Sequence, residues 1–336
     1  MELKRRHHFV SRFYLENWYE ENSLIVLKNN KQYKRSSKSV AFKQDFYKIV
    51  PLKTQQIELF KSFAEKCNFT KLQAYKEVCL KIIETQDISQ SISKVAQELD
   101  INLPIDLENM DQDISYNTFE DKFFNEEDKF STVLSKIIED VHPMITLNDY
   151  DMLLLFIAFQ LVKTPKKIES IMKLDRQMDS HADLNFTQDE HRTFTIFMTQ
   201  CYQEYFYRLW ASKAYEITIY HNTSDIGFIT SDDPCFDQKT HVQNEVLIQL
   251  PISPKFMIEL SSNSLLNDDE KSSVLNSTYD NNYIDNTVVN NIFINFINYN
   301  EQDVLNLNSK IFNNKDVYIY AHSKKDIEAL KINTRD

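Results

Sequence analysis

Apolar residues recur at helical spacing through much of the chain, and this pattern sets the first structural expectations. Spacings of three and four residues predict helices over 55–84 (one or two helices), 130–142, 148–174, and from Thr187 to about Ala214. The run LLLFIAFQLV within 148–174 is apolar on almost every side, so this helix is expected at the centre of the core. Pro165 is expected to kink or restart it. Asn148 is the predicted N-cap of this helix, and Thr187 with Glu190 forms a capping-box pattern for the next one.

The segments whose pattern predicts a strand are shorter than those that predict a helix. SLIVLK (23–28) followed by a turn predicts a strand that returns over 33–42, and the aromatic-rich segment 7–19 favours a short helix or a buried aromatic turn. Further short strands are predicted at 216–221, 227–230, 249–260 and 317–321. Together the elements predict an α+β fold, a mainly helical domain with a small, mostly antiparallel sheet.

We expect one domain over residues 1–336, with two unusual parts. Residues 82–130 are acidic and weakly periodic, and we expect them to form a flexible insertion with a helix near 88–99. Residues 262–336 form an Asn-rich C-terminal part, in which 276–308 holds eleven asparagines. Codon bias would explain that richness as well as design would.

Composition excludes several classes of protein. The 336 residues include one glycine, Gly227, which removes the P-loop, the dinucleotide fingerprint and the G-x-S-x-G elbow. Asparagine is therefore expected at left-handed backbone positions. The four cysteines have no C-x-x-C spacing, which argues against a zinc ribbon or a disulfide framework and favours the cytoplasm. No apolar run is long enough for a membrane span, and the N-terminus does not read as a signal peptide.

Charge is distributed unevenly along the chain. The net charge is −12, yet residues 1–81 hold 17 basic and 8 acidic residues, a net of +9, whereas residues 82–151 hold 4 and 17, a net of −13. A basic N-terminal segment favours nucleic acid or another polyanion as partner. The alternative is that the basic and acidic segments face each other.

Three groups of residues could carry chemistry. His7 and His8 lie among cations that disfavour protonated imidazole, so they could act as acid, base or ligand, or simply form a cationic terminus. Gln160 and Lys163 give the central helix a polar face that must find partners or a cavity, although a satisfied core amide is equally compatible. Residues 231–233 follow a predicted strand, where an Asp pair could bind metal or substrate or form an ordinary Asx turn.

A further motif carries little weight. Arg176 and His181 have the R-x4-H spacing of helical HEPN-type ribonucleases. One such match is expected by chance in a chain with this many arginines and histidines.

Four segments together resemble one family of bacterial proteins, the domain of unknown function (DUF) 4238. They are KRRHHFVSRFYLENW (4–18), AFKQDFYKI (41–49) followed by Ile57-Glu58, FIAFQLVKTPKKI (156–168), and GFITSDDPCF (227–236) with LPISPKFMIEL (250–260) behind it. The chain departs from the family pattern at Ser11, where proline is usual, and at Lys163, where arginine is usual. Lysine keeps the charge but loses the bidentate fork of arginine.

The resemblance implies a bacterial anti-phage role and brings the candidate residues into one set. It implies that His7, His8, Glu58, Gln160, Lys163 and Asp232 converge on one site.

Our leading hypothesis is a defence effector of the abortive-infection kind that acts as a nuclease, on RNA rather than DNA. The predicted catalytic residues are His7, His8, Glu58 and Asp232, and the predicted substrate-binding residues are Arg12, Gln160, Lys163 and Ser231. Asp232 and Asp233 are the predicted ligands if Mg²⁺ is the cofactor. The alternative is a non-catalytic sensor that binds a phage-derived protein or a small anion.

Overall fold

The structure is a computed structural model, and the chain divides into two compact units. The structure describes residues 2–67, 69, 72–100, 105–140, 143–177, 184–212, 214–237, 247–262, 270–271 and 294–333. The first unit comprises 1–8, 42–126 and 167–205, and the second comprises 9–41, 127–166 and 206–336. Each unit is built from three separate stretches of sequence, and each is described below by itself.

The first unit is mostly helical. Its short sheet pairs β1 (Arg6–His8) antiparallel with β4 (Phe42–Gln44). Its helices are α2 (Thr54–Lys66), α3 (Gln73–Glu98), α4 (Ile105–Tyr116), the first part of α5 (Thr118–Glu139), most of α7 (Pro165–Asp175) and most of α8 (Gln188–Trp210). Tilted aromatic rings meet in its core, where Phe60 of α2 and Phe119 of α5 both pack on Phe197 of α8.

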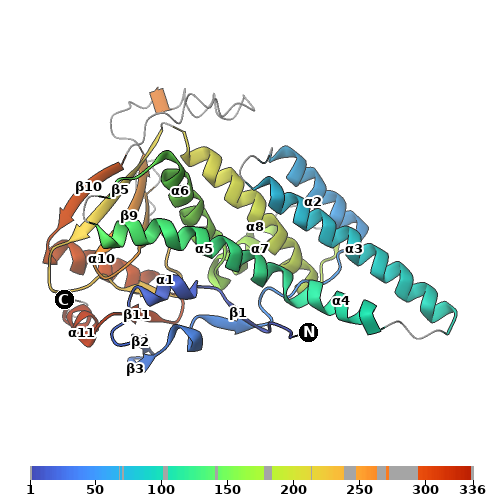
Figure 1. Ribbon diagram of the computed structural model, residues 1–336, viewed down its shortest axis with the longest axis horizontal. Coiled ribbons are helices and arrows are strands. Elements are labelled where there is room, and N and C mark those ends of the chain that lie inside the picture. Colours follow the sequence, from blue (N-terminus) through green and yellow to red (C-terminus); the bar gives the residue numbers. More distant parts are fainter. Residues whose placement is uncertain are drawn as a thin grey trace. The chain divides into compact units, whose positions relative to one another are not determined.

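The helix α3 leaves one apolar face in solvent (Figure 1 shows α3 beside α4). Ile88, Ile92, Val95 and Leu99 are 60%, 42%, 53% and 61% exposed. Their spacing of four, three and four residues places them along one side of the helix. We call this set the α3 stripe.

The second unit holds two larger sheets. The five-stranded sheet has the order β10 (Ile294–Tyr299), β5 (Tyr215–Asn222), β9 (Phe256–Ser262), β8 (Leu247–Pro251), β7 (Phe236–Asp237), and only its β10–β5 pair is parallel. The antiparallel four-stranded sheet has the order β3 (Lys31–Arg35), β2 (Leu24–Lys28), β11 (Ile319–Ala321), β6 (Thr230–Ser231). The remaining elements are α1 (Arg12–Glu16), the 3₁₀ helix η1 (Ser37–Ser39), the end of α5, α6 (Leu147–Val162), α10 (Glu301–Asn314) and α11 (Lys324–Asn333).

Large side chains from distant segments form the core of the second unit. Phe156 of α6 packs on the rings of Tyr14 from α1 and Phe130 from α5. The Tyr14 hydroxyl hydrogen-bonds to Thr230, and Trp18 Nε1–H donates to the Phe228 carbonyl at 2.8 Å. These contacts fix residues 228–230, which lead to residues 231–233, against the segment of Tyr14 and Trp18.

Most of the predicted elements are present, and the α+β class is confirmed. The central helix restarts at Pro165, and the capping box of Thr187 with Glu190 forms. The N-cap of α6 is Thr146 with Asp149 as its capping-box partner, so the prediction of Asn148 was wrong. The described residues of 82–130 form α3, α4 and α5, and the helix expected near 88–99 lies in α3. The flexible insertion stays a prediction. Most of the Asn-rich stretch 276–308 lies outside the described residues, which include β10 and the first part of α10.

Asparagine replaces glycine at turns, as expected. Positive φ angles occur in the described residues at Asn22, Asn29, Asn30 and Asn185 and at four other non-glycine positions, and Gly227 is not among them. Gly227 is needed for space instead, because a Cβ there would lie 3.1 Å from the Cβ of Pro254.

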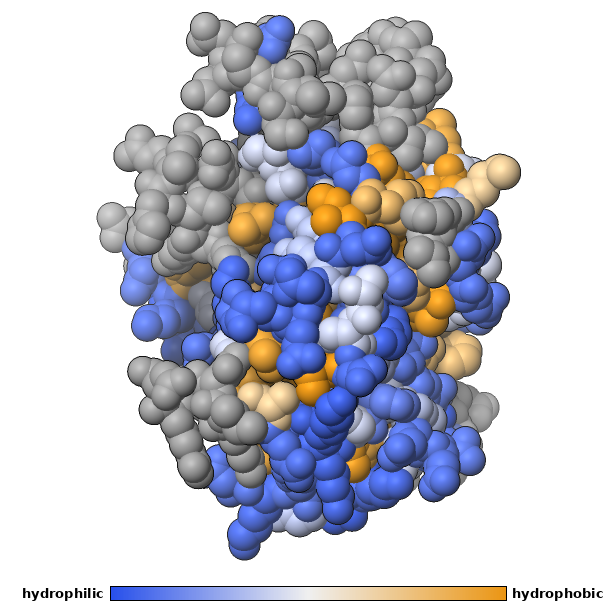
Figure 2. All heavy atoms as spheres, turned by 90° about the vertical axis from the view of Figure 1, so that its left-hand side faces the viewer, coloured by the Kyte–Doolittle hydropathy of each residue, from blue (hydrophilic) through white to orange (hydrophobic). Residues whose placement is uncertain are grey.

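One face of the molecule is mainly polar where its residues are described. On the face shown in Figure 2, hydrophilic side chains dominate and apolar ones form small separate patches. None of the helices within the described ranges has the length and apolar character needed to cross a membrane.

Candidate functional site

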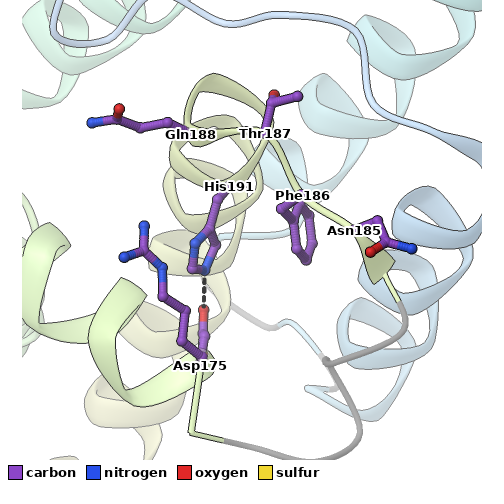
Figure 3. A pocket seen from close by; sticks show the side chains of 7 residues that line it. Asp175, Asn185, Phe186, Thr187, Gln188 and His191 are labelled. Atoms are coloured by element: carbon purple, nitrogen blue, oxygen red, sulfur yellow. Dashed lines mark ion pairs between the residues drawn. The ribbon is translucent and has the colours of Figure 1, made fainter.

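A pocket in the first unit lies between the end of α7 and the start of α8, and we call it the His191 pocket. Its volume is about 520 Å³. It is lined by Asp175, Arg176, Asn185, Phe186, Thr187, Gln188 and His191. Figure 3 shows the imidazole of His191 directed toward Asp175, with the Phe186 ring beside it.

A histidine and a carboxylate form the wall of this pocket. His191 Nε2 lies 3.5 Å from Asp175 Oδ2, and the two side chains are 5% and 6% exposed. The imidazole stacks on Phe186, with ring centroids 5.1 Å apart. Nδ1 makes no hydrogen bond to any residue that the structure describes. The contact is an ion-pair distance and not a hydrogen bond, since Asp175 Oδ2 has no hydrogen-bond partner among the described residues. The carboxylate can still stabilise a protonated imidazole, and Nδ1 is available to exchange a proton with a ligand.

The helix cap explains why His191 lies there. Thr187 Oγ1 accepts a hydrogen bond from the Glu190 N–H, and the Thr187 N–H donates to the Glu190 carboxylate at 2.8 Å. Lys53 and Gln56 of α2 also contact this carboxylate, at 3.2 and 3.3 Å. Burial raises the pKa of Glu190, but these hydrogen bonds outweigh it, so the pKa is lower than usual. The ionised carboxylate therefore anchors the first turn of α8, next to which His191 projects.

A second, smaller pocket adjoins the first. It measures about 250 Å³, and Arg176 and Gln188 line both. We call it the cationic pocket, and it is lined by Lys43, Phe46, Ile168, Glu169, Met172, Lys173, Arg176, Gln188 and Arg192. Basic side chains therefore line the cavity next to the His191 pocket.

His7, predicted as an acid or base, has both ring nitrogens occupied by backbone groups. Nδ1 accepts the Tyr47 N–H at 2.7 Å, and Nε2 lies 2.6 Å from the Lys4 carbonyl and 3.1 Å from the Tyr116 carbonyl. Burial lowers its pKa, and the contacts define the neutral imidazole with the proton on Nε2. This geometry suits a residue that joins three backbone segments better than one that faces a substrate.

The other predicted residues of the first unit are not joined to His7 by side-chain contacts among the described residues. His8 is half-buried, and its ring lies 5.9 Å from that of Phe42. Glu58 is exposed on α2 and makes no hydrogen bond or ion pair within the described residues. His7 does pair in register with Lys43, which lines the cationic pocket. The catalytic roles of His7, His8 and Glu58 stay predictions.

In the second unit, Lys163 lies in a buried polar cluster. Its ammonium, 1% exposed, lies 2.8 Å from Glu127 Oε1, 3.2 Å from Ser11 Oγ and 4.4 Å from the Phe159 ring centroid. The nearby Gln160 is fully buried, and both its amide atoms lack a hydrogen-bond partner among the described residues. Gln160 is therefore not the satisfied core amide that we considered. Lys163 is engaged with protein groups, not exposed for a substrate.

Residues 231–233 form the turn that was the alternative to a metal site. Ser231 Oγ accepts the Asp233 N–H and donates to the Asp233 carbonyl. The buried Asp233 carboxylate accepts from Thr164 at 3.0 Å and lies 3.2 Å from Lys166 Nζ. Asn314 also donates to it, at 3.4 Å.

Asp232 is held by backbone donors. Its carboxylate accepts the N–H groups of Asp316, Val317 and Tyr318 at 2.8–3.0 Å. Burial raises its pKa to about 6, although these three bonds lower it. Because protein donors occupy the oxygens of Asp232 and Asp233, the pair does not fit the predicted Mg²⁺ site. Arg12 is exposed and pairs weakly with Glu16 at 3.8 Å.

A family model matches residues 6–325, under the description "Protein of unknown function (DUF4238)". The chain belongs to the DUF4238 family. The match extends the resemblance carried by the four sequence segments into the C-terminal part of this DUF4238 protein, and it includes both units. Comparison with curated proteins found no match, and comparison with solved structures found none.

The sequence interpretation did not identify Asp175 and His191. The available signal was the Thr187–Glu190 capping box, which places His191 next to the first turn of a helix. Asp175 lies sixteen positions earlier at the end of another helix, across a segment that includes residues outside the described ranges. Only coordinates bring the two side chains together.

Proposed function

We propose that this DUF4238 protein is a nuclease that acts on RNA as an effector of anti-phage defence. The observation that carries the nuclease proposal is the His191–Asp175 pair in the wall of a pocket that Arg176 also lines. A base, a carboxylate that orients it and a guanidinium are the groups that phosphodiester cleavage through a 2′-hydroxyl needs. The defence role rests on the family resemblance.

The chemistry follows from the two nitrogens of His191. Nδ1 takes the proton of the ribose 2′-hydroxyl, the 2′ oxygen bonds to phosphorus, and the bond from phosphorus to the 5′ oxygen breaks. The leaving 5′ oxygen takes a proton from water, and the hydroxide that remains takes the proton back from Nδ1. The products are a 2′,3′-cyclic phosphate and a free 5′-hydroxyl, with His191 neutral again. Asp175 stabilises the imidazolium at Nε2, and Arg176 pairs with the charge on the phosphoryl oxygens. DNA lacks the 2′-hydroxyl and is spared.

The test uses the purified full-length chain with RNA and with DNA of the same sequence, each with and without EDTA. We expect RNA alone to be cleaved, cyclic phosphate ends, and no effect of EDTA. His191→Gln should lower the rate about 100-fold or more, since it removes the base. His221→Ala, in β5 of the second unit, is the matched control. Intact RNA, or undiminished cleavage by His191→Gln, would refute the proposal.

The sensor alternative is favoured by one separate observation, the exposed α3 stripe. A contiguous exposed apolar face is typical of protein-binding surfaces. If the chain acts by recognising a phage protein, the phage protein should co-purify with it during infection. Ile92→Asp would then abolish both capture and protection, whereas His191→Gln would leave both intact.

A further inference from the structure

The cationic pocket concentrates positive charge in a chain of net charge −12. Four basic side chains line it, from three elements: Lys43 of β4, Lys173 and Arg176 at or just beyond the end of α7, and Arg192 of α8. Glu169 is the one acidic lining residue in the described part of the chain. Such an excess of one sign in a concave site attracts an anion.

The residues that the structure describes neutralise these cations only in part. The side chains of Lys173 and Arg176 make no hydrogen bond or ion pair with the described residues. Lys43 lies 3.7 Å from Glu169, and both are more than half exposed, so this pair is weak. Arg192 donates to Asp189 through Nη2 at 2.8 Å, while its Nε is buried without a hydrogen-bond partner among the described residues. The side-chain donors of Lys173 and Arg176 therefore remain for an anionic ligand, and Arg192 can add its terminal guanidinium nitrogens but not its buried Nε.

Apolar side chains contribute the remaining walls. Phe46, Ile168 and Met172 are 3%, 2% and 8% exposed, so they belong to the packed core where it meets the pocket. Lys43 Nζ lies 5.5 Å from the Phe46 ring centroid. An inorganic anion gains nothing from such walls, whereas a nucleotide has a phosphate for the cations and a base for the apolar side chains.

The two pockets are neighbours that share two lining residues. Arg176 and Gln188 line both the cationic pocket and the His191 pocket. A phosphate next to His191 therefore has a neighbouring cavity that can take the adjacent nucleotide of the same strand.

We infer that the cationic pocket is a nucleotide subsite that binds the residue adjacent to the scissile phosphate of a single-stranded substrate. Its place beside a cleavage site rests on the proposed nuclease function, but nucleotide binding by the pocket does not. Arg192 and Lys173 hold the phosphate, and the apolar walls receive the base. A single strand is required because a paired base is not free to enter the pocket.

The experiment separates binding from cleavage by using a strand without 2′-hydroxyls. A labelled oligothymidylate is titrated into the full-length chain at several salt concentrations. We expect Arg192→Gln and Lys173→Gln each to weaken binding about tenfold, and each to reduce the salt slope by about 0.7. Lys61→Gln, at an exposed position of α2 in the same unit, should change neither.

A second comparison tests the ligand class. Thymidine monophosphate should compete with the labelled strand at lower concentration than inorganic phosphate does. Equal competition by the two would overturn a nucleotide subsite, because the apolar walls would then contribute nothing. Undiminished binding by both cation variants, or no binding by the wild type, would overturn it too. Normal binding without RNA cleavage would overturn the nuclease proposal and leave the subsite standing.

Discussion

Lys122 places an ammonium group inside the first unit, and its replacement by methionine should stabilise the protein. Lys122 lies on α5, is 8% exposed, and has its Nζ 5.1 Å from the Phe119 ring centroid. Burial lowers its pKa from 10.5 to about 8. Methionine has a similar shape and no charge, so Lys122→Met removes the desolvation penalty and keeps the packing.

The size of the pKa shift of Lys122 sets the expected gain in the free energy of unfolding. A change from 10.5 to about 8 corresponds to about 3 kcal/mol at 1.36 kcal/mol for each tenfold change in proton affinity. The attraction of the ammonium to the Phe119 ring offsets about 1 kcal/mol of this gain. We therefore expect Lys122→Met to raise the free energy of unfolding at pH 7 by about 2–3 kcal/mol.

The sign of the pH dependence follows from proton binding. Below pH 8 the lysine is charged in both states, and the folded state carries the full penalty. Between pH 8 and 10.5 the unfolded chain binds the proton more strongly, so wild-type stability rises with pH relative to the variant. The advantage of Lys122→Met should thus shrink by about 2 kcal/mol between pH 7 and 9.5.

Urea denaturation of both proteins at pH 7 and pH 9.5 measures this difference, and other titrations cancel in the comparison. Lys61→Met, at an exposed position of α2, is the control and should change stability by less than about 0.5 kcal/mol at either pH. The reasoning is refuted if Lys122→Met destabilises the chain at pH 7, or if its advantage is the same at both pH values.

Three further predictions concern the second unit, and urea denaturation measures each. Gly227→Ala should cost about 1–3 kcal/mol, because its Cβ would lie 3.1 Å from that of Pro254; unchanged stability would contradict the close approach. Lys163→Met should cost about 3–5 kcal/mol, because Glu127 loses its charged partner and keeps only the hydrogen bond from Ser11 among the described residues. Adding Glu127→Leu should restore most of it, and additive losses would contradict a coupled pair. Burial raises the pKa of Asp232 from 3.8 to about 6, so wild-type stability relative to Asp232→Asn should fall by about 2 kcal/mol between pH 4 and 6. The same stability difference between wild type and Asp232→Asn at pH 4 and at pH 6 would show that the three N–H donors to Asp232 cancel the effect of its burial.

Several residues in the family-resembling segments satisfy internal backbone or side-chain groups. His7 bonds to three backbone segments, Asp232 accepts three N–H groups, and Lys163 pairs with Glu127. Polar residue types at these positions suggested chemistry, but burial requires that such groups be satisfied in the same way. Residue type alone does not distinguish the two uses.

In the acidic segment 82–130, exposed apolar side chains and buried polar ones weaken the helical periodicity of the sequence. The outer part of α3 presents apolar side chains to solvent at Ile88 and Leu99, while the buried Gln86 and Ser89 are polar. The usual pattern of apolar inside and polar outside holds at Ile82 and Ile83 but is lost in this outer part, so the periodicity there is weak. The helix itself is unbroken from Gln73 to Glu98.

The sequence by itself determined the local elements, because their causes are local. Helical spacing, the Thr187–Glu190 cap, the restart at Pro165 and asparagine at left-handed turns each depend on residues a few positions apart. Tertiary structure decided the site, because the Asp175–His191 pair and the pocket beside it join side chains from separate elements. Contacts between side chains on separate elements depend on how the helices pack, and a single sequence does not show that packing.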